Sequence, residues 1–179
     1  MKEERSFVIN KTQIGTIKIT YSDTNIYSIE LYDFTLNKLN TIDKDRIEIA
    51  GYNEFVVERI SGEDSEISDR ALYQLYEYFV GKRKIFDFPY ELIGTDFQKK
   101  VWNKLTEIPY GSLVSYLYIA KAIDNPSASR AVGNAVGKNP LLIVVPCHRV
   151  IKKDGNMGGF SSGIQLKKYL IELEKGRRR

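Results

Sequence analysis

The sequence predicts an α+β fold, with a small antiparallel sheet in an N-terminal domain and a mainly helical C-terminal domain that contains a helix-turn-helix. Residues 6–33 are rich in β-branched and aromatic residues, whereas residues 95–175 carry apolar residues at helical spacing between capping residues. A proline-containing irregular stretch, residues 84–93, separates the two patterns. A chain of 179 residues is long enough for two small domains. We therefore expect a structural domain over residues 1–88 and a second domain over residues 89–179.

The N-terminal half is predicted to form three strands and then one helix. The strands are expected over residues 6–10, 14–21 and 25–33. The helix is expected over residues 67–81, with Ser68 or Asp69 as its cap. This half contains no convergent set of reactive side chains, which favours a structural role.

The C-terminal half is predicted to contain four helices. The first begins at Thr95, which forms a capping box with Gln98 three residues later. Ser115 and Ser127 are the expected caps of the next two helices, and the last helix is expected over residues 163–175.

The second and third of these helices are joined by a short turn at residues 124–126, which indicates a helix-turn-helix. The later helix, residues 127–137, carries mostly small side chains, with Arg130 as a large cation near its start. Such a surface allows another backbone to approach closely, which suits either a neighbouring helix or a nucleic-acid groove. The structural alternative is tight internal packing with Arg130 in solvent.

Charge and composition restrict the function classes. Residues 94–179 contain 15 Lys and Arg against 6 Asp and Glu, a net charge of +9, whereas residues 1–93 contain 12 against 17, a net charge of −5. This asymmetry is typical of a protein whose basic half contacts a polyanion, although a solvated lysine-rich surface is the alternative. One cysteine and one histidine exclude a four-ligand zinc site of the usual kind. Without an apolar span or a signal sequence, we expect a cytoplasmic protein with no membrane contact.

The only cysteine and the only histidine are neighbours, Cys147 and His148, at the end of an apolar run. A thiol is a nucleophile as its thiolate, and a histidine can accept the proton directly or through water. A carboxylate would orient that histidine, and Glu174 borders the apolar face of the last helix, whereas Glu172 lies on the opposite side. Neighbours in an extended chain point to opposite faces, so the pair acts together only if residues 146–149 turn. A structural cysteine and histidine are the alternative.

The motif PCHRV, preceded by RAVGNAVGKNPLLIVV, resembles the active-site region of the O6-alkylguanine-DNA alkyltransferases, the methylated-DNA–protein-cysteine methyltransferases. The resemblance extends upstream through GTDFQKKVWNKLTEIPYGSLVSYLYIA and downstream through GGFSSGIQLKKYLIELE, and so covers nearly all of residues 94–174. It implies DNA repair by irreversible transfer of the alkyl group of O6-alkylguanine, and also of O4-alkylthymine, from duplex DNA to a cysteine that reacts once. It also implies minor-groove binding and base flipping.

The resemblance further implies the catalytic residues. Cys147 is similar to the alkyl acceptor, and His148 and Glu174 occupy the places of a cysteine–water–histidine–glutamate chain. Tyr116 resembles the tyrosine that helps to rotate the 3′ phosphate and donates a proton to the departing guanine. Asn139 resembles the asparagine that braces the turn before the active-site segment.

The implied DNA contacts are centred on the small-residue helix, where Arg130 resembles the arginine that enters the base stack. The implied DNA-binding residues are Arg130, Tyr116, Ser129, Ala131, Gly133, Asn134 and Lys138, and the implied substrate-pocket residues are Pro146, Val150, Phe160 and Ser161. Lys99, Lys100 and the basic tail, residues 176–179, are further candidates for phosphate contacts, with a solvated tail as the alternative. The expected partner is double-stranded DNA that contains O6-alkylguanine, bound by a monomer without a cofactor or metal.

Two differences from many relatives and two competing functions stay open. Asn134 stands where many relatives have glycine, and Phe160 where they have tyrosine, so we expect methyl adducts to be accepted and leave bulky adducts undecided. A lesion-binding module with an idle thiol is the alternative function. A cysteine hydrolase is disfavoured, because it needs a histidine from another part of the chain and none exists.

Overall fold

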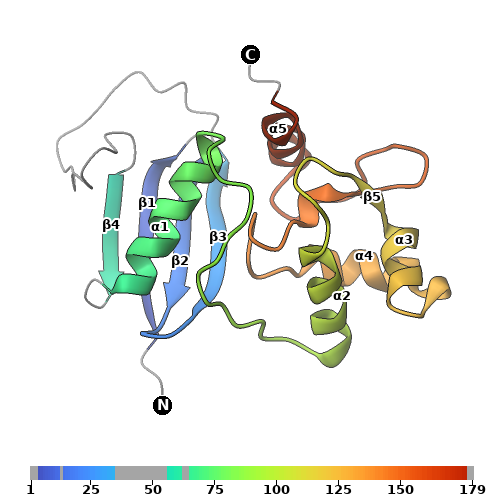
Figure 1. Ribbon diagram of the computed structural model, residues 1–179, viewed down its shortest axis with the longest axis horizontal. Coiled ribbons are helices and arrows are strands. Elements are labelled where there is room, and N and C mark those ends of the chain that lie inside the picture. Colours follow the sequence, from blue (N-terminus) through green and yellow to red (C-terminus); the bar gives the residue numbers. More distant parts are fainter. Residues whose placement is uncertain (1–3, 13, 35–55, 62–64, 177–179) are drawn as a thin grey trace. The chain divides into compact units, whose positions relative to one another are not determined.

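The computed structural model describes residues 4–12, 14–34, 56–61 and 65–176. The chain divides into two compact units, Met1–Glu91 and Leu92–Arg179, whose elements are labelled in Figure 1. The boundary expected after residue 88 lies close to this division. The α+β fold class is confirmed, because the first unit is built on an antiparallel sheet and the second is mainly helical.

The N-terminal unit holds a four-stranded antiparallel sheet in the order β3-β2-β1-β4. The strands are β1 (Arg5–Thr12), β2 (Gly15–Tyr21), β3 (Ile26–Phe34) and β4 (Val56–Ser61). Ile17 lies opposite Ile9 on one side and Leu31 on the other, so apolar residues share one face of the sheet. The three predicted strands are confirmed. Sequence analysis did not predict β4, because Glu58 and Arg59 interrupt its apolar residues.

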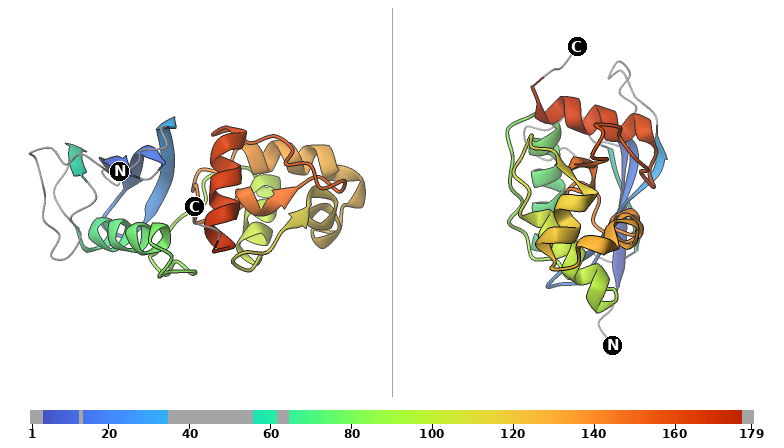
Figure 2. Two further views of the ribbon diagram at one scale, coloured as in Figure 1. Left: turned by 90° about the horizontal axis from the view of Figure 1, so that it is seen from above. Right: turned by 90° about the vertical axis from the view of Figure 1, so that its right-hand side faces the viewer.

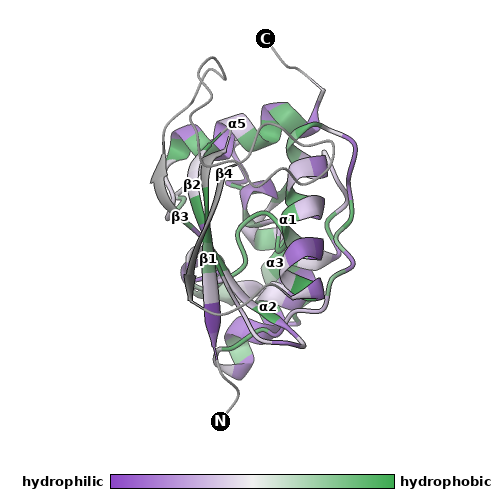
Figure 3. Cartoon of the chain, turned by 90° about the vertical axis from the view of Figure 1, so that its left-hand side faces the viewer, coloured by the Kyte–Doolittle hydropathy of each residue, from purple (hydrophilic) through white to green (hydrophobic). Residues whose placement is uncertain are grey.

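Helix α1 (Glu66–Phe79) lies across one face of this sheet (Figures 1 and 2). Leu72, Leu75 and Phe79 recur at helical spacing and are buried. In Figure 3 the hydrophobic colour follows β1 and β2, the strands at the centre of the sheet. The predicted helix cap is wrong: Ser65 caps α1, and Ser68 is its partner in a capping box three residues later.

The C-terminal unit contains four α-helices, as the sequence predicts. They are α2 (Asp96–Thr106), α3 (Tyr116–Ala122), α4 (Ser129–Gly137) and α5 (Ile164–Glu174). The capping box of Thr95 with Gln98 and the Ser115 cap of α3 are both confirmed. In the described part of the chain, no helix combines the length and apolar character needed to cross a membrane.

Helices α3 and α4 form the predicted helix-turn-helix, but α4 begins later than expected. The 3-10 turn Pro126–Ala128 precedes it, and the hydroxyl of Ser127 donates to the Asn125 side chain 3.1 Å away rather than capping the helix. The N-cap of α4 is therefore Ala128 rather than Ser127, and among the described residues no side chain caps the helix.

Two long-range contacts fix how the elements of this unit pack around the cysteine-bearing segment. The indole nitrogen of Trp102, buried on α2, donates to the carbonyl of Ala135 on α4 at 2.8 Å. The two-residue strands β5 (Val114–Ser115) and β6 (Val150–Ile151) pair in parallel, which the sequence did not predict. Because β5 leads into α3 and β6 follows Cys147, this pairing places the start of α3 beside the cysteine-bearing segment (Figure 2).

Candidate active site

A buried segment carries the thiol into the C-terminal unit. All residues from 141 to 150 are buried. Hydrogen bonds from Val144 N to Leu142 O and from Val145 N to Leu141 O coil the apolar run that precedes Cys147. Ile143 has a φ of 74°, a left-handed conformation that is rare for a β-branched residue. The run is therefore a series of tight turns that places Cys147 at a fixed depth.

Asn139 holds these turns together and contacts the thiol. Its Oδ1 accepts from the Leu141 N–H at 3.0 Å. Its Nδ2 lies 2.8 Å from the Val145 carbonyl, 3.2 Å from the Leu141 carbonyl and 3.1 Å from Cys147 Sγ. Two amide hydrogens are shared among these three acceptors. The side chain thus spans the segment between α4 and the cysteine and ends on the sulfur.

Cys147 and His148 lie in the 3-10 turn Cys147–Arg149, so the turn that the pair requires is present. His148 Nε2 lies 2.7 Å from Glu174 Oε1. Because an ionised carboxylate only accepts hydrogen bonds, Nε2 carries the hydrogen of the neutral ring. His148 Nδ1 is buried and has no hydrogen-bond partner among the described residues. The lone pair on Nδ1 is therefore the one available to accept a proton.

Four hydrogen bonds hold Glu174. Its Oε1 accepts from His148 and from Arg149 Nη2 at 2.9 Å, and its Oε2 accepts from Arg149 Nε and the Gly111 N–H, each at 2.9 Å. Burial raises the pKa of Glu174, but the hydrogen bonds from His148 and Arg149 lower it by more. The pKa of Glu174 therefore falls below its ordinary value, to about 2. Burial lowers the pKa of His148 below its ordinary value, against the opposing effect of Glu174. The resting pair is an ionised carboxylate and a neutral imidazole.

The thiol has its own electrostatic surroundings. Burial raises the pKa of Cys147, while the Asn139 hydrogen bond and the charge of Lys167 lower it. Lys167 is fully buried on α5, and burial lowers its pKa to about 8. Its Nζ donates to the carbonyls of Val150 and Met157. A buried cation thus acts electrostatically on the thiol and links Val150 to Met157, on either side of residues 151–156.

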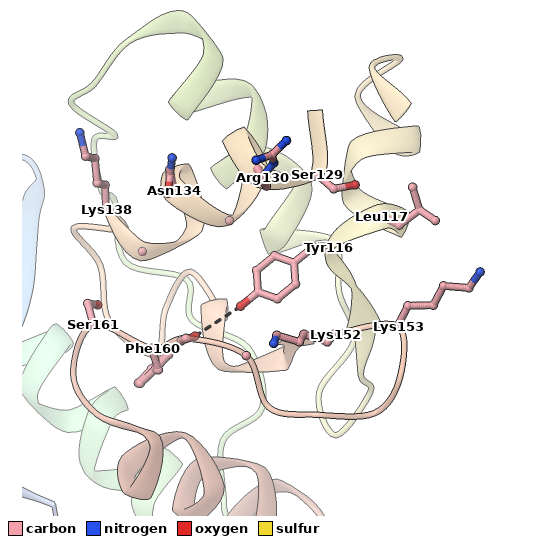
Figure 4. Close-up of a pocket in the computed structure, with 14 residues that line it drawn as sticks. Tyr116, Leu117, Ser129, Arg130, Asn134, Lys138, Lys152, Lys153, Phe160 and Ser161 are labelled. Atoms are coloured by element: carbon pink, nitrogen blue, oxygen red, sulfur yellow. Dashed lines mark hydrogen bonds between the residues drawn. The ribbon is translucent and has the colours of Figure 1, made fainter. Parts of the chain in front are cut away.

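A groove of about 950 Å³ lies between α4 and the loop that contains residues 152–161 (Figure 4). Tyr116 stands between these two walls, and its hydroxyl donates to the Gly159 carbonyl at 3.3 Å. Gly158 has a φ of 67°, and a Cβ there would lie 3.0 Å from the Tyr116 ring, so this close approach requires glycine. Lys167 Nζ lies 5.8 Å from the ring centroids of both Tyr116 and Phe160. The aromatic wall and the thiol therefore share one buried cation.

Comparison with known proteins shows what this arrangement belongs to. The sequence model described as "6-O-methylguanine DNA methyltransferase, DNA binding domain" matches residues 96–176. A Bacillus subtilis protein named "Methylated-DNA--protein-cysteine methyltransferase, inducible" is 40% identical over 170 residues, which cover 93% of each chain. The chain belongs to the methylated-DNA–protein-cysteine methyltransferase family.

Further relatives in this methyltransferase family agree. A Methanosarcina acetivorans protein with the name "Methylated-DNA--protein-cysteine methyltransferase" is 51% identical over 112 residues, 63% of this chain and 72% of the relative. The fold is similar to that in a crystal structure of Mycobacterium tuberculosis OGT in complex with DNA, with a TM-score of 0.76 and 34% identity over 96% of this chain and 93% of that one. The likeness thus spans both units.

The predicted DNA-binding and pocket residues, together with Cys147, differ in where they lie relative to the groove. Those that line the groove are Tyr116, Ser129, Arg130, Gly133, Asn134, Lys138, Phe160 and Ser161. Pro146, Val150 and Cys147 are buried and do not line it, and Cys147 is only 4% exposed. Ala131 is exposed on α4 outside the groove. In the protein without DNA, neighbouring residues therefore cover the sulfur of Cys147 beside the groove.

The other predicted positions lie away from this groove. Lys99 and Lys100 are exposed on α2 and do not line it, and Glu172 is exposed on α5 as expected. Residues 177–179 of the basic tail lie outside the described residues. In the described ranges, no three His, Cys, Asp or Glu side chains cluster in a way that could hold a metal ion.

The sequence analysis did not identify Arg149 or Lys167 as site residues, although the sequence contains a pattern that indicates each of them. Arg149 follows the histidine in PCHRV, and its bidentate contact with Glu174 is fully within the buried site. Lys167 lies seven residues before Glu174 on α5, so helical periodicity places both on the same face. A lysine on the apolar face of a helix is the pattern that would have identified it.

Proposed function

We propose that the chain repairs DNA by irreversible transfer of an alkyl group to Cys147, from O6-alkylguanine and also from O4-alkylthymine. The observation that carries the proposal is the buried thiol in one turn with His148, whose Nε2 contacts Glu174 and whose Nδ1 is unpaired among the described residues. The names of the relatives, and a similar structure solved with DNA, support this activity.

The proton of the thiol has a path in this geometry. A water bridges Cys147 to His148 Nδ1, which accepts the proton, and the ionised Glu174 stabilises the imidazolium that forms. The sulfur attacks the alkyl carbon, a carbon–sulfur bond forms, and the bond from that carbon to the guanine oxygen breaks. The electron pair remains on guanine, which takes a proton from the Tyr116 hydroxyl. Burial and the Cys147 charge raise the pKa of Tyr116, which keeps this hydroxyl protonated at neutral pH.

Substrate access requires an everted base. The alkyl carbon is hidden in a duplex, and flipping its nucleotide costs a few kcal/mol. Helix α4 enters the minor groove with its small side chains, and Arg130, exposed near its start, fills the place that the base leaves. Because Cys147 is buried in the free protein, the groove wall opens locally when the base enters.

Mass spectrometry tests alkyl transfer directly. After incubation with a duplex that contains O6-methylguanine, the peptide with Cys147 should gain the mass of one methylene group. Cys147→Ala should bind the same duplex and remove no methyl group. An unmodified Cys147 peptide at saturating duplex would contradict the proposal and favour a lesion-binding module.

Arg130→Ala tests the flipping role separately. It should slow repair of methylated duplex more than reaction with free O6-benzylguanine, because only the duplex substrate requires eversion. Single-turnover rates on both substrates measure this difference. Equal losses on both would show that Arg130 does not act in flipping.

A further inference from the structure

Two lysines on the loop across the groove from α4 have no role in the proposed chemistry. Lys152 and Lys153 are exposed and line the groove, and Figure 4 shows them on the opposite side of Tyr116 from Lys138. They belong to a short turn after β6, residues 152–156, which we call the lysine turn.

The lysine turn is held in shape by its own hydrogen bonds. Lys152 N donates to the Asn156 carbonyl at 2.8 Å, and Gly155 N donates to the Lys152 carbonyl at 3.0 Å. Asn156 donates to both carboxylate oxygens of Asp154, from its backbone at 3.0 Å and from its side chain at 2.8 Å. Asp154 is exposed and does not line the groove, although it lines a smaller hollow together with Lys152 and Lys153.

Both ends of the lysine turn are anchored beside the active site. On one side β6 pairs with β5, and on the other the carbonyl of Met157 accepts from the buried Lys167. Lys152 follows Cys147 by only five residues, through β6. The two lysines are therefore presented at a fixed distance from the sulfur, rather than on a loose loop.

The charges around the groove fit a polyanion. Its described lining contains four cations, Arg130, Lys138, Lys152 and Lys153, and no carboxylate. Arg130 and Lys138 lie on α4 or directly after it, whereas Lys152 and Lys153 lie on the facing wall. A helix that enters the minor groove has a sugar–phosphate backbone on each side, so cations on both walls match the two rows of phosphates.

We propose that Lys152 and Lys153 bind the DNA phosphate backbone close to the everted nucleotide, opposite the contacts made from α4. The inference rests on the proposed binding of duplex DNA and adds a second contact wall to it. The lysine turn then fixes the register of the duplex relative to Cys147, because the same short segment carries both. Phosphate contacts position a duplex without reading its sequence, which suits a protein that must find a lesion in any sequence.

The test compares salt dependences of binding to an unmodified duplex, measured by fluorescence anisotropy on the full chain. Each phosphate contact contributes about −0.9 to the slope of log K against log salt concentration. Lys152→Ala combined with Lys153→Ala should therefore make the slope shallower by about 1.8. Lys152→Arg with Lys153→Arg should keep the wild-type slope. The matched control, Lys168→Ala with Lys175→Ala, removes the same charge from α5 and its C-terminal end, outside the groove, and should change the slope by less than about 0.5.

An unchanged slope in the Lys152 and Lys153 alanine variant, or an equal change in the Lys168 and Lys175 control, would overturn the inference. The arginine variant guards against misfolding, because lost binding there as well would exclude charge as the cause and reject the proposal. The duplex carries no lesion, so these results do not depend on alkyl transfer. If the wild-type protein transferred no methyl group, the proposed alkyl transfer would be contradicted. The comparison of salt dependences would still test whether Lys152 and Lys153 contact phosphates.

Discussion

The two units bury polar groups of different kinds. In the described part of the N-terminal unit, the buried polar residues are uncharged: Ser6, Thr12, Ser22, Ser68 and Gln74. In the C-terminal unit they are all ionisable: His148, Arg149, Lys167 and Glu174. Burying a charge costs several kcal/mol unless it is paired and hydrogen-bonded. The N-terminal unit thus avoids this free-energy cost, whereas the C-terminal unit incurs it in one cluster of buried side chains.

The ionisable groups of the C-terminal unit gather around Cys147. Glu174 pairs with His148 and Arg149, and Lys167 shares an electrostatic contact with the thiol. By contrast, the Arg70–Asp87 ion pair of the N-terminal unit lies at the surface, with side chains 45% and 57% exposed. Charged side chains are thus buried in this protein where they can act on a reacting sulfur, and they are exposed to solvent where their role is structural.

Removing one buried charge should have the largest effect. Glu174→Gln leaves Arg149 without its anion, so we expect a loss of about 3–5 kcal/mol in the free energy of unfolding. The matched change Asp87→Asn at the exposed pair should cost far less, because solvent screens both charges. Urea denaturation measures both. Similar losses for the two variants would remove the contrast between the units.

A core substitution should separate stability from chemistry. Ile17→Ala in the sheet removes a fully buried side chain and should cost about 2–5 kcal/mol. At a temperature where the variant stays folded, its rate with free O6-benzylguanine should remain within about twofold of wild type, since Asn139 and Lys167, which act on the thiol, both belong to the C-terminal unit. Ile17→Val, expected to cost about 1 kcal/mol, is the milder control. A large rate loss in the folded variant would show that the N-terminal unit contributes to catalysis.

Acid should act on the buried charge cluster. Glu174 has a pKa of about 2 in the folded chain, against 4.5 for an ordinary glutamate. Its ionised form therefore stabilises the fold above pH 4.5, and this contribution, about 3 kcal/mol, is lost as the pH falls from 4.5 towards 2. Denaturation at a series of pH values measures the loss. If Glu174→Gln retained the full wild-type decline in this range, other carboxylates would be its source.

A neutral hydrogen bond in the same unit should matter least. Trp102→Phe removes the donor to the Ala135 carbonyl, which still accepts from Lys138 N at 3.1 Å. We expect a loss of about 1 kcal/mol by thermal or urea unfolding. A loss as large as that of Glu174→Gln would mean that the C-terminal unit is sensitive to any buried change, and not to charge in particular.

Local features of the fold were predictable because they depend on residues three or four positions apart. The capping box at Thr95 and the Ser115 cap were identified correctly, as were the helices that follow them. The Ser127 cap is wrong even at this range, because Ser127 lies in a 3-10 turn before α4 and its hydroxyl donates to the Asn125 side chain. Strand β4 was not predicted because it lies at the edge of the sheet and its sequence shows little alternation of apolar and polar residues.

The sequence by itself determined the reactive pair, since Cys147 and His148 are unique and adjacent, and it placed Glu174 on the inner side of its helix. Only the tertiary structure decided that Arg149 and Lys167 join them and that a cation-lined groove opens alongside. His148 and Glu174 are 26 residues apart, and the Gly111 N–H reaches the same carboxylate across 63 residues. Such contacts depend on how helices and turns pack together, and spacing along the chain encodes only the faces that each element presents.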